Sequence, residues 1–511
     1  MTESSGPNST AGFHSKVDRR SLLKAAAVTI VPRHVLGGAG FVPPSEKLNV
    51  ACIGVGSQGL RVMLEFLQER DVQIVSVCDV NRFGNNYPEW GRHEFRKKVR
   101  RLLGGDGSTW IDWLSTGRPI RLTRSVTAYA GVAGREPCRK IVNAYYGLRR
   151  RSGSYRGGTA YVDFRELLEK EHDVDAVIVG TPDHWHAHVS IAAMKKGKHV
   201  FCQKPMTRTV YEARRMAEVA RETGVATQVA LKVQASESTR QLAEWIAAGV
   251  IGPVRQVINW SSRPLWPQGI DPPCGALPVP EGLDWDLWLG PSPARPYHEA
   301  YLPFVWRGWH DFGTGAVGDM GCYSFDTMFR VLGLEAPERI EASSSEHPEQ
   351  SFPKACIHYW TFPARKGRPA VEIRWYDGGL RPATPAEMGN AELAGEGLLF
   401  VGDAGKILCG FSGSNPRLIP ESRMRSFVPP PKTLPRSPGN HREWIDAAKG
   451  AAAPCGANFV FEAKVTEAIL LANVALRTGH RLRWDREGLR VPDVPEAAAL
   501  IHPEYRAGWE L

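Results

Sequence analysis

The strongest structural restriction in this sequence is a glycine turn formed by Gly54, Gly56 and Gly59. An apolar run with strand composition, 48–53, precedes the turn, and a helical pattern follows it. Glycines at these positions allow a tight turn and a close approach of the backbone to a pyrophosphate at the helix N-terminus. We therefore expect a dinucleotide at this turn, with Ser57 and Gln58 among the residues that bind it.

A second apolar run, 72–80, carries an acidic residue, Asp79, near its end. Asp79 follows Gly59 by about 20 residues, which is the spacing at which a carboxylate accepts hydrogen bonds from the adenosine ribose. The same carboxylate would repel a 2′-phosphate, so NAD is the favoured cofactor. Arg82, close by in the sequence, leaves NADP open as an alternative.

Two further strands are predicted at 175–180 and 199–202, with a helical segment between them. Strands and helices that alternate in this way predict a doubly wound parallel sheet, which binds ligands beyond the carboxyl ends of its strands. Two turns meet that condition, 180–186 and 203–205. We expect the following residues of these turns to bind the cofactor: Thr181, Pro182, His186, Gln203 and Lys204. His184 and His186 can instead cap the helix that follows.

The length of 511 residues exceeds what one core usually fills, so two domains are expected. We predict a signal and linker at 1–46, a Rossmann domain at 47–232 and an α+β domain at 233–511. Alternating polar and apolar residues at 254–260, 354–362 and 370–377 predict a largely antiparallel open sheet in the second domain. Such a sheet forms a platform beside the first domain or between subunits, and we expect a homo-oligomer. Helices predicted at 441–450 and 461–485 return to the first domain.

The connection 83–157 is far longer than an ordinary loop. We expect a helix at 134–150 and irregular structure at 104–119. The insertion can cap the cofactor site, support oligomerisation or be a surface elaboration, and the last interpretation is slightly favoured.

The charge and the cysteines of the chain say little about its function. The net charge is +10, and the nine cysteines are scattered along the sequence. No nucleic-acid-binding motif accompanies the basic residues, so a solvated basic face is expected rather than a nucleic-acid partner. None of the cysteines forms a CxxC pair, and we expect neither a disulfide framework nor a metal site.

The N-terminal segment 18–31 places Arg19 and Arg20 before a short apolar run and resembles a twin-arginine export signal. A disordered basic tail is the alternative. The apolar run is too short to span a membrane, and no other segment approaches that length. We expect an exported, periplasmic protein, or a cytoplasmic one if the signal does not function.

The glycine turn, Asp79, the segment TPDHWH (181–186), the Lys204–Pro205 pair and the segment 309–329 together resemble the Gfo/Idh/MocA oxidoreductases. The resemblance runs from about residue 47 to the C-terminus, apart from the insertion. It implies an NAD(P)-dependent oxidoreductase in which Asp319 and Tyr323 belong to the substrate motif of the second domain. Gln203 replaces the family's usual glutamate, and Tyr323 replaces its usual histidine.

Asp319, Tyr323 and Asp326 are spaced so that one face of a helix presents all three side chains. Oxidation of a sugar hydroxyl needs a proton acceptor and a nearby positive charge. Tyr323 is the expected proton carrier and Lys204 the electrostatic stabiliser, which also helps to lower the pKa of the phenol. Asp319 is assigned to catalysis or to the orientation of Lys204, and Asp326 to substrate contact.

Aromatic and basic residues are concentrated at 295–311, just before this helix. Aromatic faces match the C–H surfaces of sugars, so Trp306, Arg307 and Trp309 are predicted substrate contacts. A structural role for the tryptophans is equally consistent with the sequence. The expected substrate is a carbohydrate or cyclic polyol.

We predict hydride transfer at a CH–OH group or ketone. Two alternatives remain: a redox-neutral enzyme that processes glycosides through transient oxidation and elimination, and a protein that binds a sugar or cofactor without catalysis.

Overall fold

A computed structural model describes residues 42–105, 109–123, 126–149, 154–365 and 367–511. The chain forms two compact units, Met1–Lys47 and Leu48–Leu511. In the first unit, Pro44–Glu46 form one turn of 3-10 helix, and the predicted export segment lies outside the described residues. None of the described helices combines the length and the apolar composition needed to cross a membrane.

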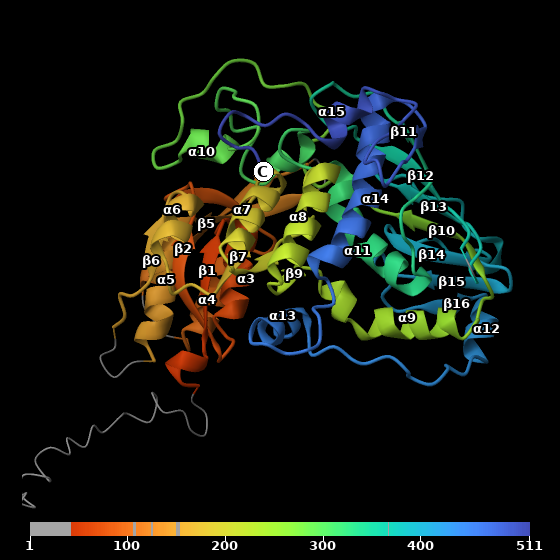
Figure 1. The fold of residues 1–511 in the computed structure, drawn as a ribbon, viewed down its shortest axis with the longest axis horizontal. Coiled ribbons are helices and arrows are strands. Elements are labelled where there is room, and N and C mark those ends of the chain that lie inside the picture. The colour runs from red at the N-terminus through yellow and green to blue at the C-terminus, as the bar shows by residue number, and fades with distance from the viewer. Residues whose placement is uncertain (1–41, 106–108, 124–125, 150–153, 366) are drawn as a thin grey trace, which may run out of the picture. The chain divides into compact units, whose positions relative to one another are not determined.

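A six-stranded parallel sheet with the order β6-β2-β1-β7-β8-β9 forms the N-terminal part of the second unit (Figure 1). Its strands are β1 (Leu48–Ile53), β2 (Val72–Cys78), β6 (Thr159–Tyr161), β7 (Ala176–Val179), β8 (His199–Cys202) and β9 (Thr227–Val229). One face packs on α6 (Phe164–Lys170), α7 (Asp183–Lys195) and α8 (Val210–Thr223), and the other on α3 (Ser57–Phe66) and α5 (Arg135–Gly147). The predicted doubly wound Rossmann sheet is confirmed.

An eight-stranded sheet with the order β16-β15-β14-β10-β13-β12-β11-β17 follows in the C-terminal part. Its strands are β10 (Val254–Trp260), β11 (Arg339–Ser344), β12 (Cys356–Phe362), β13 (Val371–Tyr376), β14 (Gly397–Gly402), β15 (Gly405–Cys409), β16 (Arg417–Ile419) and β17 (Leu482–Arg483). Neighbouring strands are antiparallel except β10 and β13, which run parallel. The predicted, largely antiparallel sheet is thus confirmed.

Long buried helices lie between the two sheets (Figure 1). Helix α14 (Phe459–Thr478) packs on α8, on α11 (Gly315–Leu332) and on β11, and α9 (Glu237–Ala247) packs on α11. Helix α14 is shorter than the predicted 461–485, because Gly479 adopts a φ of 67° and ends the helix in the left-handed region that glycine favours. The remaining described helices are α4 (Glu94–Leu102), α10 (Trp285–Leu289), α12 (Glu421–Arg425), α13 (Asn440–Ala448) and α15 (Ala497–Ile501).

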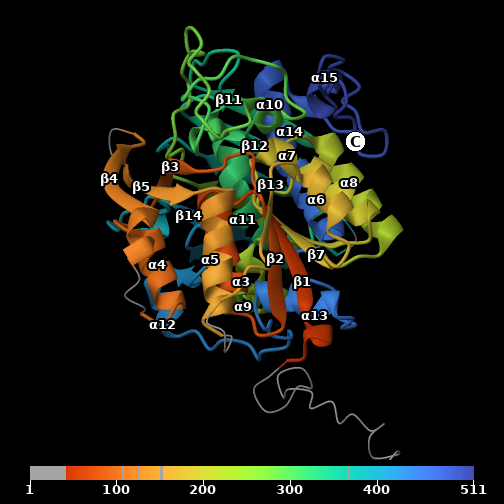
Figure 2. The ribbon, with the colours of Figure 1, turned by 90° about the vertical axis from the view of Figure 1, so that its left-hand side faces the viewer.

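The predicted insertion 83–157 contains two different parts. Helix α5, which the sequence predicts, is the crossover between the parallel strands β2 and β6. The other part is an antiparallel sheet of β3 (Gly84–Glu89), β5 (Thr127–Ala133) and β4 (Ser115–Arg121), hereafter the inserted sheet (Figure 2). The sequence does not predict these strands.

The inserted sheet packs on the glycine turn. A Cβ atom added to Gly56 would lie 2.9 Å from the ring of Tyr87 in β3. Just after β5, the N–H of Gly134 donates to the carbonyl of Val55 at 3.3 Å. These contacts favour a capping role for the insertion over the surface elaboration slightly favoured by the sequence.

Candidate active site

A cavity of about 770 Å³ opens beyond the carboxyl ends of the parallel strands. Its lining includes the residues that follow five of these strands: Gly54 after β1, Asp79 after β2, Gly180 after β7, Gln203 after β8 and Ala230 after β9. Ligands of doubly wound sheets bind at this edge. The cavity is therefore the candidate active site.

The glycine turn has the geometry that the motif requires. Gly54 has a φ of 81°, and an added Cβ would lie 2.5 Å from the backbone nitrogen of Thr181. An added Cβ on Gly59 would lie 1.9 Å from the carbonyl oxygen of Gly54. Helix α3 begins at Ser57, directly after Gly56, so that Gly59 lies in its first turn, and the first N–H groups of the helix have no acceptor within it. Ser57 and Gln58 in that first turn line the cavity, where these N–H groups can bind a phosphate.

Asp79 stiffens the same turn from the neighbouring strand. Its carboxylate accepts hydrogen bonds from the backbone N–H groups of Val55 and Asn81, both at 2.8 Å. Burial raises the pKa of Asp79 to about 6, although these two hydrogen bonds act in the opposite direction. A carboxylate oxygen can accept more than one hydrogen bond, so Asp79, which lines the cavity, can also bind a ribose hydroxyl.

Three buried polar atoms at the cavity are suited to a polar ligand. Thr181 Oγ1, Asp183 Oδ1 and Asn440 Oδ1 belong to cavity-lining residues and have no hydrogen-bond partner among the described residues. Buried polar atoms of native proteins almost always have a partner, and a bound dinucleotide would supply one. Together with the glycine turn, these atoms fit NAD. The sequence does not predict Asn440, at the start of α13, as a cavity residue, because an asparagine at the start of a helix is typical of an ordinary helix cap.

His186 holds two cavity turns together. Its ring nitrogens lie 2.7 Å from the carbonyl oxygen of Pro205 and 3.0 Å from that of Thr181. Burial lowers the pKa of His186 to about 4, so the ring is neutral at pH 7 and donates to one of these carbonyls. His184 is also buried, with Nε2 2.9 Å from the carbonyl oxygen of Trp288. Neither ring lines the cavity, and the structure therefore does not bring His186 to the predicted cofactor contact.

Lys204, Asp319 and Arg307 form a buried ionic cluster in the cavity wall. Lys204 Nζ lies 2.9 Å from Asp319 Oδ1, and Arg307 Nε lies 3.0 Å from the same oxygen. Burial alone lowers the pKa of Lys204, but Asp319 and Tyr323 raise it by more, so the amine is charged. Burial raises the pKa of Asp319, but the two cations lower it by more, so the carboxyl is ionised. The cluster carries two positive charges and one negative charge.

Tyr323 meets this cluster from α11, one helical turn after Asp319. Lys204 Nζ lies 5.1 Å from the centroid of its ring, and both residues line the cavity. Burial raises the pKa of Tyr323, and Lys204 lowers it by less, so the net pKa lies above the ordinary value. Lys204 lowers the pKa of the phenol, as the sequence predicts, but burial outweighs this effect and the net pKa is raised. Tyr323 therefore holds its proton at pH 7.

The four predicted substrate contacts divide into two pairs. Trp306 and Arg307 line the cavity, and the guanidinium carbon of Arg307 lies 4.1 Å from the Trp306 ring centroid. Trp309 and Asp326 do not line it. Trp309 is 1% exposed and donates from Nε1 to the carbonyl of Ala300 at 2.8 Å, within an aromatic core.

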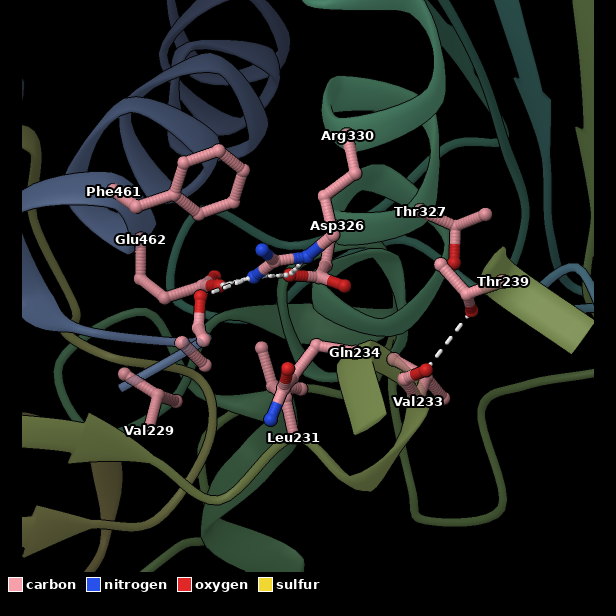
Figure 3. A network of polar contacts seen from close by, with 12 residues as sticks. Val229, Leu231, Val233, Gln234, Thr239, Asp326, Thr327, Arg330, Phe461 and Glu462 are labelled. Carbon is pink, nitrogen blue, oxygen red and sulfur yellow. Dashed lines mark hydrogen bonds and ion pairs between the residues drawn. The ribbon is translucent and has the colours of Figure 1, made fainter. Parts of the chain in front are cut away.

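Asp326 belongs to a separate buried network (Figure 3). Its Oδ1 accepts hydrogen bonds from Arg330 at 2.9 and 2.6 Å, and Arg330 also bonds to Glu462 at 3.2 Å. The ring of Phe461 covers the guanidinium at 4.2 Å. The structure thus places Asp326 in a network that ties α11 to α14, outside the lining of the cavity.

The fold and the cavity define an NAD-binding Rossmann protein with a second, α+β domain. Comparison with known families agrees with this class. Residues 139–231 match the oxidoreductase family, NAD-binding Rossmann fold, and residues 259–361 match the C-terminal α/β domain of the same family, GFO_IDH_MocA. The two matches support a Gfo/Idh/MocA family oxidoreductase, as the sequence motifs predict.

Similar proteins of known name act on sugars or glycosides. The chain is 29% identical to a 1,5-anhydro-D-fructose reductase of Ensifer adhaerens over 184 residues, 35% of this chain and 44% of the relative. It is 32% identical to a glycosyl hydrolase family 109 protein 1 of Shewanella sp. (strain ANA-3) over 217 residues, 42% of this chain and 35% of the relative. The chain therefore spans less than half the length of these two curated relatives.

A solved structure shares the fold over most of the chain. The WlbA dehydrogenase of Bordetella pertussis, in complex with NADH and UDP-GlcNAcA, has a TM-score of 0.51 and 14% sequence identity, and the alignment covers 86% of this chain and 99% of that one. At this identity the likeness concerns the fold, and it agrees with the two-domain architecture described above.

Proposed function

We propose that this protein is an NAD-dependent oxidoreductase that interconverts a CH–OH group and a ketone of a sugar or cyclic polyol. The observation that carries the proposal is that Lys204, which follows β8, and Tyr323, in helix α11, line one cavity beside the glycine turn. NAD bound at the turn supplies the two-electron redox chemistry.

In the direction of ketone reduction, Tyr323 gives its hydroxyl proton to the carbonyl oxygen of the substrate. The ammonium group of Lys204 stabilises the negative charge that develops on that oxygen. The excess positive charge of the cluster favours an oxyanion, and Asp319 holds both cations in place. In the direction of oxidation, the phenolate form of Tyr323 accepts the proton of the hydroxyl, while the ammonium group of Lys204 stays protonated beside the oxygen.

The proposed substrate class rests on the lining of the cavity and on the relatives. Trp306 offers an aromatic face to the C–H surface of a sugar, and Arg307 and Asp183 offer polar groups to its hydroxyls. The matched relatives include a 1,5-anhydro-D-fructose reductase, an enzyme named for the reduction of a sugar.

Redox-neutral processing of glycosides is the second candidate function. The match to a glycosyl hydrolase over 217 residues favours it. In such a reaction a sugar carbon would be oxidised transiently, the aglycone would leave by elimination, water would add in its place, and the carbon would then be reduced again, with no net change in the NAD that the glycine turn would hold.

Two measurements on the purified full-length protein test these functions. Mass spectrometry of the native protein should find a retained dinucleotide, and incubation with sugars and polyols should change NADH absorbance. Release of aglycone from glycosides without net NADH formation would favour the second function. A protein that neither retains nor binds NAD would overturn both.

We also propose export through the twin-arginine-like segment and assembly into a homo-oligomer. Replacement of Arg19 and Arg20 by lysine should keep the protein in the cytoplasm, and light scattering should give a mass above that of one chain. A monomer, or a variant that is still exported, would contradict these proposals.

A further inference from the structure

The cavity has an aromatic wall built from three distant chain segments. Trp90 directly follows β3 of the inserted sheet, Trp266 belongs to the connection after β10, and Phe304 belongs to the segment before α11. The ring centroids of Trp90 and Phe304 lie 5.4 Å apart, and those of Trp266 and Phe304 lie 6.0 Å apart. All three residues line the cavity that also contains Lys204 and Tyr323.

Trp90 is unusual because it is both firmly held and accessible. Its side chain is 49% exposed, although it lines the cavity. Its backbone N–H donates to Glu94 at 3.0 Å, and Glu94 binds Arg61 of helix α3 at 2.8 Å. Arg61 also donates to the carbonyl of Pro88 at 3.0 Å. The backbone that carries this exposed tryptophan is thus tied to helix α3.

Phe304 is held at some conformational cost. Its φ is 72°, in the region that residues other than glycine rarely adopt. Such a conformation is strained, and it persists where the surroundings enforce it. Here the carbonyl of Phe304 accepts a hydrogen bond from Arg307 at 3.1 Å, and the guanidinium carbon of Arg307 lies 4.6 Å from the Phe304 ring centroid.

Arg307 connects this wall to the reaction centre. It contacts Phe304 on one side and Asp319 on the other, and Asp319 binds Lys204. A continuous series of contacts therefore leads from the proposed catalytic ammonium to Trp90. Lys204 and Trp90 line the same cavity, so a ligand bound at Lys204 can extend along Arg307 and Phe304 toward Trp90.

We propose that Trp90 and Phe304 form a second subsite, which binds the part of the substrate that is not oxidised. The proposal rests on the proposed function and narrows its substrate class. The substrate is a glycoside whose second ring, a pyranose or an aryl aglycone, places an apolar face on Trp90. Aromatic faces bind such rings by offset or edge contacts.

The test compares matched substrates on the NAD-loaded full-length enzyme. The kcat/KM of free monosaccharides and methyl glycosides is measured against that of the corresponding disaccharides and phenyl glycosides. We expect the second ring to raise kcat/KM about tenfold, the size of one good aromatic contact. Trp90→Ala should remove this gain and leave the methyl glycoside unchanged, whereas Trp90→Phe should keep most of it. The disaccharide and phenyl series distinguish a sugar ring from an aryl ring.

The matched control is Phe83→Ala. Phe83 is 48% exposed at the start of the inserted sheet and does not line the cavity, so its replacement should alter neither series. The subsite would be overturned if Trp90→Ala lowered kcat/KM equally for the one-ring and the two-ring substrates, or lowered it for neither. A dimer dissociated by Trp90→Ala with the selectivity intact would also overturn it.

Calorimetric titration with a phenyl glycoside separates this proposal from the proposed function. The protein could bind the phenyl glycoside, and Trp90→Ala could weaken that binding, although the protein oxidises and reduces no sugar. That result would support the subsite and contradict the proposed oxidoreductase activity. Turnover of monosaccharides with no preference for a second ring would support the oxidoreductase activity and contradict the subsite.

Discussion

Lys204 Nζ lies 5.1 Å from the centroid of the Tyr323 ring, although one residue follows a strand of the parallel sheet and the other belongs to α11. Asp319 holds the ammonium on this side of the cavity through an ion pair at 2.9 Å. The proposed charge stabiliser and the proposed proton carrier can therefore contact one carbon–oxygen bond of a substrate.

Replacement of Lys204 by methionine should lower kcat and leave NAD bound. The loss of one preorganised positive charge at a developing oxyanion typically costs about 10²–10³-fold in rate. Arg307 still pairs with Asp319 in this variant, so the carboxylate does not remain buried alone. Steady-state kinetics and mass spectrometry of retained NAD check the prediction. Lys196→Met, at an exposed site, is the control; unchanged turnover in Lys204→Met would remove the proposed role.

Replacement of Tyr323 by phenylalanine should lower kcat by about 10²–10⁴-fold, the usual contribution of a general acid. Tyr376→Phe, outside the cavity, should have no such effect. Because the pKa of Tyr323 is raised, ketone reduction by the wild type should not decline until the pH exceeds about 10. Tyr323→His should move that decline toward neutral pH. A pH–rate profile shared by wild type and Tyr323→His would argue against a proton role.

Local spacing predicted the part of the site that depends on backbone geometry. Gly54 and Gly59 were predictable because a side chain at either position would overlap backbone atoms. Lys204 was predictable because residues after parallel strands share one edge of the sheet. Asp79 was found in the same way.

Long-range packing decided the rest. Asp319 and Asp326 share a helical face, but about two turns separate them, and the cavity reaches the first and not the second. Trp306 and Trp309 have similar sequence surroundings, yet one lines the cavity and the other fills a core. Trp90 gave no local signal, since only the docking of the inserted sheet brings it to the cavity.

Replacement of Asp79 by alanine should weaken NAD binding and reduce the preference for NAD over NADP. The variant loses charge-assisted hydrogen bonds worth about 1.5–3 kcal/mol each, and it no longer repels a 2′-phosphate. Titration calorimetry with both dinucleotides gives the two affinities. Glu46→Ala, which lies outside the cavity lining, is a charge-matched control. Unchanged relative affinity for NAD and NADP would contradict the ribose contact.

Replacement of Asp183 by asparagine should stabilise the protein at pH 8 and have little effect at pH 4. Burial raises the pKa of Asp183 to about 8, against about 3.9 in an unfolded chain. The folded state therefore favours the protonated acid, and this contribution is complete below pH 4 and is lost as the pH rises through 8. Asparagine remains neutral and can still accept the hydrogen bond from Thr314. Thermal melts across this pH range check the effect, with Asp173→Asn as control; parallel curves for wild type and Asp183→Asn would contradict it.

Replacement of Arg330 by methionine should destabilise the fold and leave the substrate KM nearly unchanged. The variant leaves Asp326 and Glu462 buried without their cation, which typically costs about 3–5 kcal/mol. Urea unfolding measures this loss, and the double variant Arg330→Met with Asp326→Asn should recover part of it, because no unpaired charge remains at position 326. Arg339→Met removes an exposed ion pair and should cost less than about 1 kcal/mol. A raised KM with undiminished stability in Arg330→Met would return Asp326 to the substrate site, because the network would then orient a ligand contact rather than join α11 to α14.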